Sequence, residues 1–243
     1  VVWPFMAAAH DRVREKENFD FDWKFILNAD DQANAGMQVS ETGWQDVQLP
    51  HDWSISQNFD PKLSGSNGHL PGGIGWYRKM FRVDKKDKGR RIAVLFDGIY
   101  SRSDVYVNGQ HLGFRPYGFC YQEYDLTPYL NYGAENVLAV RVNNPLEHDS
   151  VARWYTGAGI YRHAWLVKTA EVHVASYGTY VTTPVVTAER AEVRVRTSVA
   201  NEAERTKTLS VRQQITDGEG RTVVQSGKQA LQVAAGQTAD TEH

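Results

Sequence analysis

The 243-residue chain is poor in cysteine: Cys120 stands alone, so no internal disulfide can form. It lies between Phe119 and Tyr121 in a strand-like run, which favours a buried small side chain over a nucleophile. No apolar run approaches the length of a membrane span, and the net charge of −2 is spread over both signs. These absences argue against a membrane-spanning protein and against nucleic acid or an acidic membrane surface as a partner.

The sequence also lacks metal and cofactor motifs. Its eight histidines are scattered without a paired ligand spacing, so no zinc site, other metal or cofactor is expected. Asp30-Asp31 could contact calcium, but an exposed polar loop is the favoured interpretation. His51-Asp52 pairs an imidazole with a carboxylate, yet no serine or cysteine nucleophile with a supporting motif accompanies it. A structural hydrogen-bonding role is therefore favoured for this pair.

Strand signals are abundant. Short β-branched or aromatic runs separated by turn residues predict an all-β protein of the jelly-roll sandwich type. Asn108-Gly109 predicts a tight hairpin, and Asp125–Leu130 predicts one helical turn with Thr127 as N-cap and Pro128 at its first position. The expected strands are Trp76–Val83, Arg91–Gly98, Ser103–Gly113, Asn136–Val142 and Ile160–Lys168.

Three segments follow from changes in composition. Residues 1–9 are apolar and end in three alanines, which is typical of a signal-peptide remnant and predicts an exported, periplasmic protein; an ordinary N-terminal strand is the alternative. Residues 10–169 form the predicted jelly-roll domain. Residues 170–243 are Val/Thr-rich and nearly free of aromatics, as in an immunoglobulin-like sandwich. Such a domain has about seven strands in roughly 100 residues, so we expect about five here, with exposed edges that favour a homodimer.

Six motifs in order resemble glycoside hydrolase family 2, and most closely its β-galactosidases. They are Leu49–Trp53, Leu70–Lys79, Phe96–Gly113, Tyr124–Leu130, Glu135–Val142 and Arg153–Leu166. The resemblance implies a jelly-roll sugar-binding domain, an immunoglobulin-like domain and then a (β/α)8 barrel that carries both catalytic glutamates of a retaining mechanism. The barrel would lie beyond His243, so this chain alone is expected to be inactive.

The resemblance also points to substrate-binding residues. In family members the loop before the G-I-Y-R strand lines the sugar pocket, and some members place there an aspartate that contacts substrate or a cation. Arg153 stands at that position and cannot ligate a metal, but it could donate paired hydrogen bonds to sugar hydroxyls. Trp154 and Tyr155 could stack on a pyranose ring. The further candidates around the same pocket are His69, Asn67 and Asp52.

Two carboxylates invite a catalytic interpretation. Glu123 and Asp125 share one face of a strand, whereas retention needs two carboxyl groups on opposite sides of the sugar ring. We therefore predict no catalytic residue within this chain.

The function expected from the resemblance is the non-catalytic N-terminal region of an exported retaining exo-β-glycosidase. A β-galactoside is the favoured substrate, and the region would complete the pocket and scaffold the missing barrel. A free-standing carbohydrate-binding module is a second hypothesis, because the aromatic content of 12% suits sugar stacking. The corresponding regions of β-glucuronidases and β-mannosidases share this first domain, so they remain alternatives. A purely structural sandwich pair is disfavoured by the Arg153–Leu166 loop.

Overall fold

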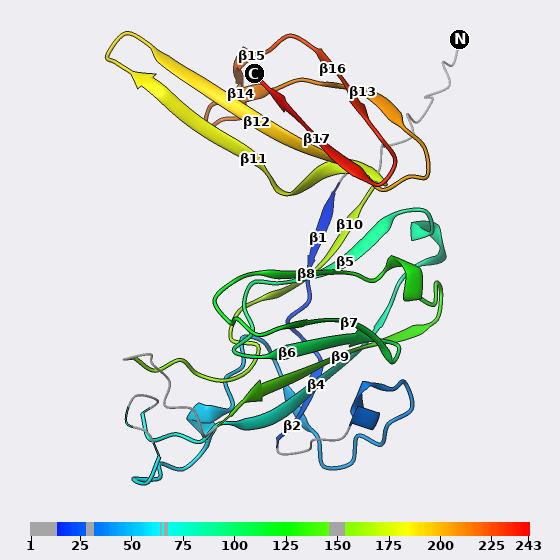
Figure 1. Cartoon of the computed structure of the whole chain (residues 1–243), viewed down its shortest axis with the longest axis vertical. Coiled ribbons are helices and arrows are strands. Elements are labelled where there is room, and N and C mark those ends of the chain that lie inside the picture. The colour runs from blue at the N-terminus through cyan, green and yellow to red at the C-terminus, as the bar shows by residue number, and fades with distance from the viewer. Residues whose placement is uncertain (1–13, 28–31, 64, 66–67, 146–153) are drawn as a thin grey trace, which may run out of the picture. The chain divides into compact units, whose positions relative to one another are not determined.

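The computed structural model describes residues 14–27, 32–63, 65, 68–145 and 154–243. This part of the chain forms two compact units, the sandwich unit Glu15–Lys168 and a C-terminal unit made of Arg14 and Thr169–His243. The division coincides with the change in composition near Thr169-Ala170 (Figure 1). Residues 1–9, assigned to a signal-peptide remnant, lie outside the described residues. Within the described ranges, no helix has the length and apolar character needed to cross a membrane.

The sandwich unit is a jelly-roll of two antiparallel sheets (Figure 1). The larger sheet has the order β3-β2-β4-β9-β6-β7 and the smaller one β1-β10-β5-β8. The strands are β1 Glu15–Asn18, β2 Trp23–Leu27, β3 Gln45–Val47, β4 Gly73–Arg82, β5 Arg91–Phe96, β6 Ser103–Val107, β7 Gln110–Arg115, β8 Gln122–Asp125, β9 Glu135–Asn144 and β10 Ala164–Thr169. Short 3₁₀ turns are η1 Gln32–Ala35, η2 Ser54–Ser56, η4 Lys85–Asp87 and η5 Thr127–Tyr129.

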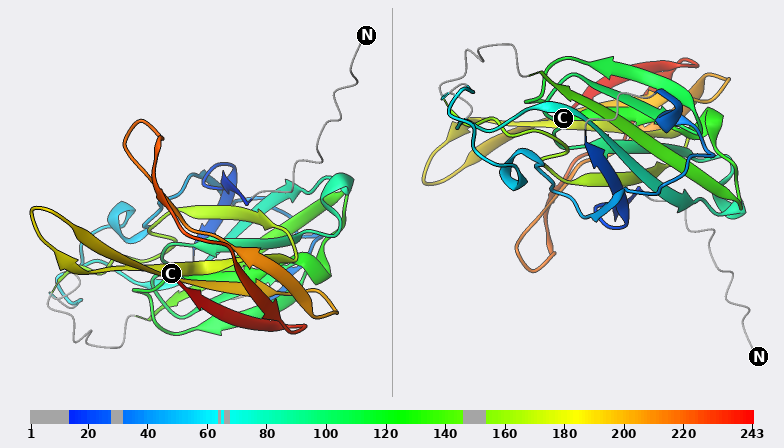
Figure 2. Two further views of the ribbon diagram at one scale, coloured as in Figure 1. Left: turned by 90° about the horizontal axis from the view of Figure 1, so that it is seen from above. Right: turned by 90° about the horizontal axis from the view of Figure 1, so that it is seen from below.

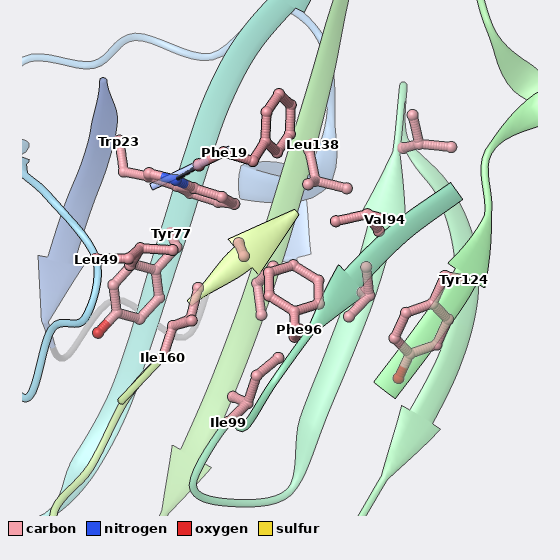
Figure 3. Packing of buried hydrophobic residues seen from close by; sticks show 14 of the residues in the cluster. Phe19, Trp23, Leu49, Tyr77, Val94, Phe96, Ile99, Tyr124, Leu138 and Ile160 are labelled. Carbon is pink, nitrogen blue, oxygen red and sulfur yellow. Dashed lines mark hydrogen bonds between the residues drawn. The ribbon is translucent and has the colours of Figure 1, made fainter. Parts of the chain in front are cut away.

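One hydrophobic core fills the space between these sheets. Trp23 and Tyr77 from the larger sheet meet Val94 and Phe96 from the smaller one, and all four are fully buried (Figure 3). Ile160 joins the same cluster from the segment that precedes β10. The core therefore extends to one end of the sandwich, where the candidate site lies.

The predicted turns are present, with one difference in detail. Asn108 and Gly109 both have positive φ and connect β6 to β7, as the dipeptide predicts. The helical turn η5 forms over Thr127–Tyr129, but no side-chain capping bond was found at its N-cap, which is Leu126 rather than Thr127. The Thr127 hydroxyl instead accepts a hydrogen bond from the Ile92 amide at 2.8 Å, while Asp125 accepts one from the Thr127 amide. Thr127 thus fastens the turn to β5.

The strand predicted over Ile160–Lys168 begins only at Ala164, so its first part is wrong. The apolar alternation that suggested a longer strand comes from burial in the core and not from a sheet ladder. Ile160 is buried, but its carbonyl accepts a hydrogen bond from the His51 amide, in a loop. The Asp20 carboxylate then binds the Ala164 amide and marks where the ladder starts.

The prediction of a strand-like segment around Cys120 is also wrong. The residues from Gly118 to Cys120 form a bend between β7 and β8, and Cys120 is half-buried there. Phe119 and Tyr121 on either side of it are exposed. Because both neighbours are aromatic, the run imitates strand composition, but it closes a loop.

The C-terminal unit is an immunoglobulin-like arrangement of short strands. Its strands are β11 Val172–Val186, β12 Ala191–Asn201, β13 Lys207–Val211, β14 Gln214–Thr216, β15 Thr222–Gln225, β16 Gln229–Val233 and β17 Gln237–Glu242. A three-stranded sheet has the order β11-β12-β17, and β13-β16 and β14-β15 form two further pairs. In Figure 2 the β14–β15 hairpin, in orange, diverges from the β11–β12 ribbon, in yellow. Val223 and Val224 of β15 are exposed. The unit has seven strands, so the expectation of about five was wrong, because several of the strands are only three to five residues long. Self-association through this unit stays a prediction.

Candidate functional site

Three of the sequence motifs meet at one end of the sandwich unit. They are the loop His51–Ser54, the Gly-rich segment Gly68–Gly75 and the segment Trp154–Ile160. The first and third run side by side, because the amides of His51 and Trp53 donate to the carbonyls of Ile160 and Ala158 at 2.8 and 3.1 Å. The second is attached through the Ser54 hydroxyl, which donates to the Pro71 carbonyl at 3.0 Å.

The Asp52 carboxylate lies at the centre of this junction. Its Oδ1 atom accepts hydrogen bonds from the amides of Ser54 and Ala158, both at 2.9 Å. Its Oδ2 atom accepts a bond from the Tyr155 hydroxyl at 2.6 Å. Two of the three donors belong to a segment more than a hundred residues away in the sequence, so the carboxylate joins the two loops.

Trp154 and Tyr155 carry the exposed aromatic surface of the site. The Trp154 side chain is 63% exposed and that of Tyr155 is 40% exposed. Partial burial, and then the hydrogen bond to Asp52, raise the pKa of the Tyr155 phenol, so it stays protonated at neutral pH. The site therefore presents two aromatic rings, of which one is held by its hydroxyl and the other is open to solvent.

His51 is bound inward. Its Nδ1 atom lies 2.8 Å from the hydroxyl of Tyr77, a fully buried residue of β4, and its ring packs against Phe25. Burial lowers the pKa of His51, and the nearby Asp52 charge only partly opposes this. His51 is therefore neutral at pH 7, and its Nδ1 atom shares a hydrogen bond with the Tyr77 hydroxyl. This arrangement agrees with the structural role expected for the His51-Asp52 pair.

The neutral state of His51 predicts a pH dependence of stability. The pKa of His51 is lower in the folded than in the unfolded chain, so the unfolded state takes up a proton first as the pH falls below about 6.5. The contribution of His51 is complete above that pH and declines as the pH falls toward the folded-state pKa. We expect the midpoint of urea denaturation of the sandwich unit to be lower at pH 5 than at pH 7.5. The same change in pH should lower the midpoint of His51→Gln by a smaller amount.

Tryptophan fluorescence provides the measurement, since no tryptophan follows Trp165. Gln110→Asn, at an exposed position of β7 without a titratable side chain, is the control and should retain the wild-type pH dependence. An unchanged pH dependence in His51→Gln would contradict the assignment of a neutral buried imidazole.

Four of the six residues predicted to bind substrate are described. Asp52 and Tyr155 are in direct contact, and Trp154 adjoins them in the chain. His69 is exposed; its Nδ1 atom is 2.8 Å from the Leu63 carbonyl, and the neighbouring Gly68 approaches the Tyr155 ring. Arg153 and Asn67 lie outside the described residues, as do Asp30 and Asp31. Within the described ranges, no three His, Cys, Asp or Glu side chains gather as a metal site would require.

Two glycines of the site were not among the residues predicted to bind substrate. A Cβ atom on Gly157 would lie 2.6 Å from Asp52 Oδ2, and one on Gly159 would lie 2.3 Å from the Tyr77 hydroxyl. Both have positive φ, +73° and +125°. The alternation Gly-Ala-Gly directly before an apolar run was the available signal, since such a pattern is typical of close backbone approach.

A second group of aromatic residues adjoins the site. The rings of Tyr100, Tyr117 and Tyr161 surround Phe119 at centroid distances of 5.1, 5.8 and 6.5 Å. Tyr100 pairs with Gly159 through two backbone hydrogen bonds, which connects this group to the loop described above. Tyr117 and Phe119 are largely exposed. The sequence pattern concealed this group because its members come from three separate loops.

Comparison with known proteins decides the family. The family model described as "Glycosyl hydrolases family 2, sugar binding domain" matches residues 17–170, which include the whole site. The chain belongs to glycosyl hydrolase family 2. This confirms the resemblance seen in the six motifs.

Family 2 relatives differ in their named activities. β-Galactosidase BoGH2A of Bacteroides ovatus is 45% identical over 216 residues, which cover 88% of this chain and 25% of the relative. A β-glucuronidase of Formosa agariphila is 34% identical over 242 residues, covering 88% of this chain and 24% of its own length. The chain thus spans about a quarter of the length of these family 2 relatives.

Solved family 2 structures share the fold of both units. A family 2 member from Bacteroides cellulosilyticus superposes with a TM-score of 0.83 at 38% identity, covering 94% of this chain and 31% of that one. A family 2 β-glucuronidase gives a TM-score of 0.86 at 30% identity, covering 97% of this chain and 27% of that one. The chain contains the sugar-binding domain of family 2, and its all-β fold is confirmed.

Proposed function

We propose that this chain completes the substrate pocket of a retaining exo-β-galactosidase and scaffolds its catalytic barrel. The observation that carries the proposal is the site itself: two exposed aromatic side chains, Trp154 and Tyr155, on a loop that is fixed by Asp52. Aromatic faces stack on pyranose rings, and a rigid loop keeps its contacts in place without an ordering cost upon binding. Arg153 would add paired hydrogen bonds to sugar hydroxyls at the same position.

A β-galactoside is the preferred substrate because the β-galactosidase relative is 45% identical, against 34% for the β-glucuronidase. A β-glucuronide is the second candidate, supported by the TM-score of 0.86 to a β-glucuronidase. Glucuronic acid differs from galactose in the configuration at C4 and in its C6 carboxylate, and a cation such as Arg153 could also bind that carboxylate. Specificity is therefore tested directly below.

The chemistry itself is assigned to the barrel. Glu123 and Asp125 of β8 are the carboxylate pair that most resembles a glycosidase pair. Glu123 is engaged by Arg91 at 2.7 Å, and Asp125 binds the Thr127 amide. Hydrolysis with retention of the anomeric configuration needs a nucleophile and an acid/base residue on opposite sides of the anomeric carbon, with their carboxyl groups about 5 Å apart. Neither role is open to two residues that lie on one strand and are already bound.

We expect the purified 243-residue chain to hydrolyse no glycoside, because the catalytic pair lies in the barrel. The full-length gene product should hydrolyse nitrophenyl β-galactoside with a higher kcat/KM than nitrophenyl β-glucuronide. Release of nitrophenol by the chain above a mock preparation would contradict the first expectation, and a reversed preference would select the β-glucuronidase alternative. Titration calorimetry of the chain with a β-galactoside and a β-glucuronide tests the alternative of a free-standing carbohydrate-binding module. Such a module should bind sugar without the catalytic barrel.

Export to the periplasm is part of the proposal and rests on residues 1–9 alone. Fractionation of the native host, followed by N-terminal sequencing, would detect cleavage near His10. Retention of Val1 in a cytoplasmic fraction would contradict it.

A further inference from the structure

The Asp52 carboxylate is almost fully used within the protein. An ionised carboxylate offers about four lone-pair positions, and three donors already occupy those of Asp52. Bonds from backbone amides and a phenol to an ionised acceptor are among the stronger hydrogen bonds in proteins. A sugar hydroxyl would have to displace one of them. Asp52 is therefore poorly suited to the substrate contact that the sequence predicts for it.

The surroundings of Asp52 fit its carboxylate closely. Gly157 passes so near to Oδ2 that a side chain there would collide with it, and the Asn144 side-chain Nδ2 donates to the Gly157 carbonyl at 3.2 Å. The flanking bonds from His51 to Ile160 and from Trp53 to Ala158 align the two backbones. The loop is thus shaped around the carboxylate on both sides.

We propose that Asp52 is a positioning residue, which acts on the glycoside only through the aromatic residue that it orients. This inference rests on the proposed function. Asp52 fixes the Tyr155 ring through its hydroxyl and the backbone after it through the Ala158 amide. Since the Tyr155 proton is donated to Asp52, the phenolic oxygen can only accept a further hydrogen bond. Tyr155 would therefore recognise a sugar hydroxyl that acts as the donor, and Trp154 remains free to stack.

The chain contains a matched control for this arrangement. Asp20 anchors the other end of the same segment: its carboxylate accepts bonds from the Ala164 amide at 2.8 Å and from His163 at 2.6 Å. It makes the same kind of bond to a backbone amide, but among the described residues its hydrogen bonds are to other partners than Tyr155. Asp20→Asn therefore perturbs the fold of the segment without touching the aromatic residues of the site.

The first test uses the 243-residue chain and needs no activity. Tyrosine labelled with ¹³C at Cζ is titrated by NMR, and the Tyr155 signal is identified by its loss in Tyr155→Phe. We expect Asp52→Asn to lower the Tyr155 pKa toward its ordinary value and to speed hydrogen exchange of the Ala158 amide. Asp20→Asn should leave the Tyr155 titration unchanged. An unaltered Tyr155 titration in Asp52→Asn would overturn the inference.

The second test uses the full-length protein and compares KM with kcat. Asp52→Asn should raise KM for nitrophenyl β-galactoside by up to about ten-fold, because a Tyr155 that is no longer oriented loses one neutral hydrogen bond from the sugar, with kcat little changed. Tyr155→Phe should move KM in the same direction, and Asp20→Asn should not. Equal effects of Asp52→Asn and Asp20→Asn would reduce Asp52 to a purely structural role. If the full-length protein cleaves no glycoside, the proposed function fails, whereas the NMR result still reports whether Asp52 holds Tyr155.

Discussion

Replacing Gly159 with alanine is expected to lower the free energy of unfolding of the sandwich unit by about 2–5 kcal/mol, the sum of backbone strain and overpacking. The residue has φ +125°, which L-residues rarely adopt. Its new Cβ atom would also lie 2.3 Å from the Tyr77 hydroxyl and 2.6 Å from the His51 carbonyl oxygen. Both neighbours are fixed, since Tyr77 is fully buried and the His51 amide is bound to Ile160. The backbone must therefore move.

Urea denaturation followed by tryptophan fluorescence measures this loss. Apart from Trp3, every tryptophan lies in the sandwich unit, so the signal reports on that unit. Gly89→Ala is the control, because Gly89 also has positive φ, +87°, yet a Cβ atom there meets nothing within 4 Å. It should cost only the strain of about 1–2 kcal/mol. Equal losses in the two variants would show that the contact with Tyr77 does not matter.

The fold was predictable from the sequence wherever local chemistry and tertiary structure agree. Asn108-Gly109 forms the expected hairpin because both residues tolerate positive φ, and the core strands follow their apolar runs. The prediction was wrong where burial occurs without a ladder. Ile160 is as buried as a central strand residue, but the backbone around it bonds to the loop at His51. Composition records burial and cannot report which backbone atoms are paired.

The location of the site was predictable from the sequence, but the hydrogen-bond partners of its residues were not. The motifs containing Asp52, His69 and Tyr155 pointed to one region, and the structure brings Asp52 and Tyr155 within 2.6 Å. The contacts that decide their roles join segments about a hundred residues apart, and no local pattern encodes such pairs. Asp52 was expected to contact substrate, whereas its oxygens accept three internal hydrogen bonds. The sequence of a loop motif is the same whether its carboxylate contacts a ligand or a backbone amide, so the sequence alone cannot distinguish the two roles.

Trp53 packs in the hydrophobic core next to the candidate site. Its side chain is 1% exposed, stacks on Phe25 at 5.5 Å with an interplanar angle of 21°, and approaches Gly75, where a Cβ atom would collide with it. Its backbone amide also carries one of the bonds that align the Asp52 loop with Ala158. The ring therefore connects the hydrophobic core to the segment that bears Tyr155.

Trp53→Ala should lower the free energy of unfolding of the sandwich unit by about 3–5 kcal/mol, as for other buried aromatic residues truncated to alanine. The large cavity left beside Phe25 cannot close, because the surrounding strands are hydrogen-bonded on both sides. Trp53→Phe should cost only about 1–2 kcal/mol, since it keeps a stacked ring and the indole Nε1 has no hydrogen-bond partner among the described residues. Trp154→Ala, which truncates the exposed tryptophan of the site, should stay within about 0.5 kcal/mol of wild type. Urea denaturation, followed by circular dichroism because each variant removes a fluorophore, would detect these differences. A loss for Trp154→Ala equal to that for Trp53→Ala would mean that the outer ring is part of the core, and would contradict its assignment as the free stacking surface.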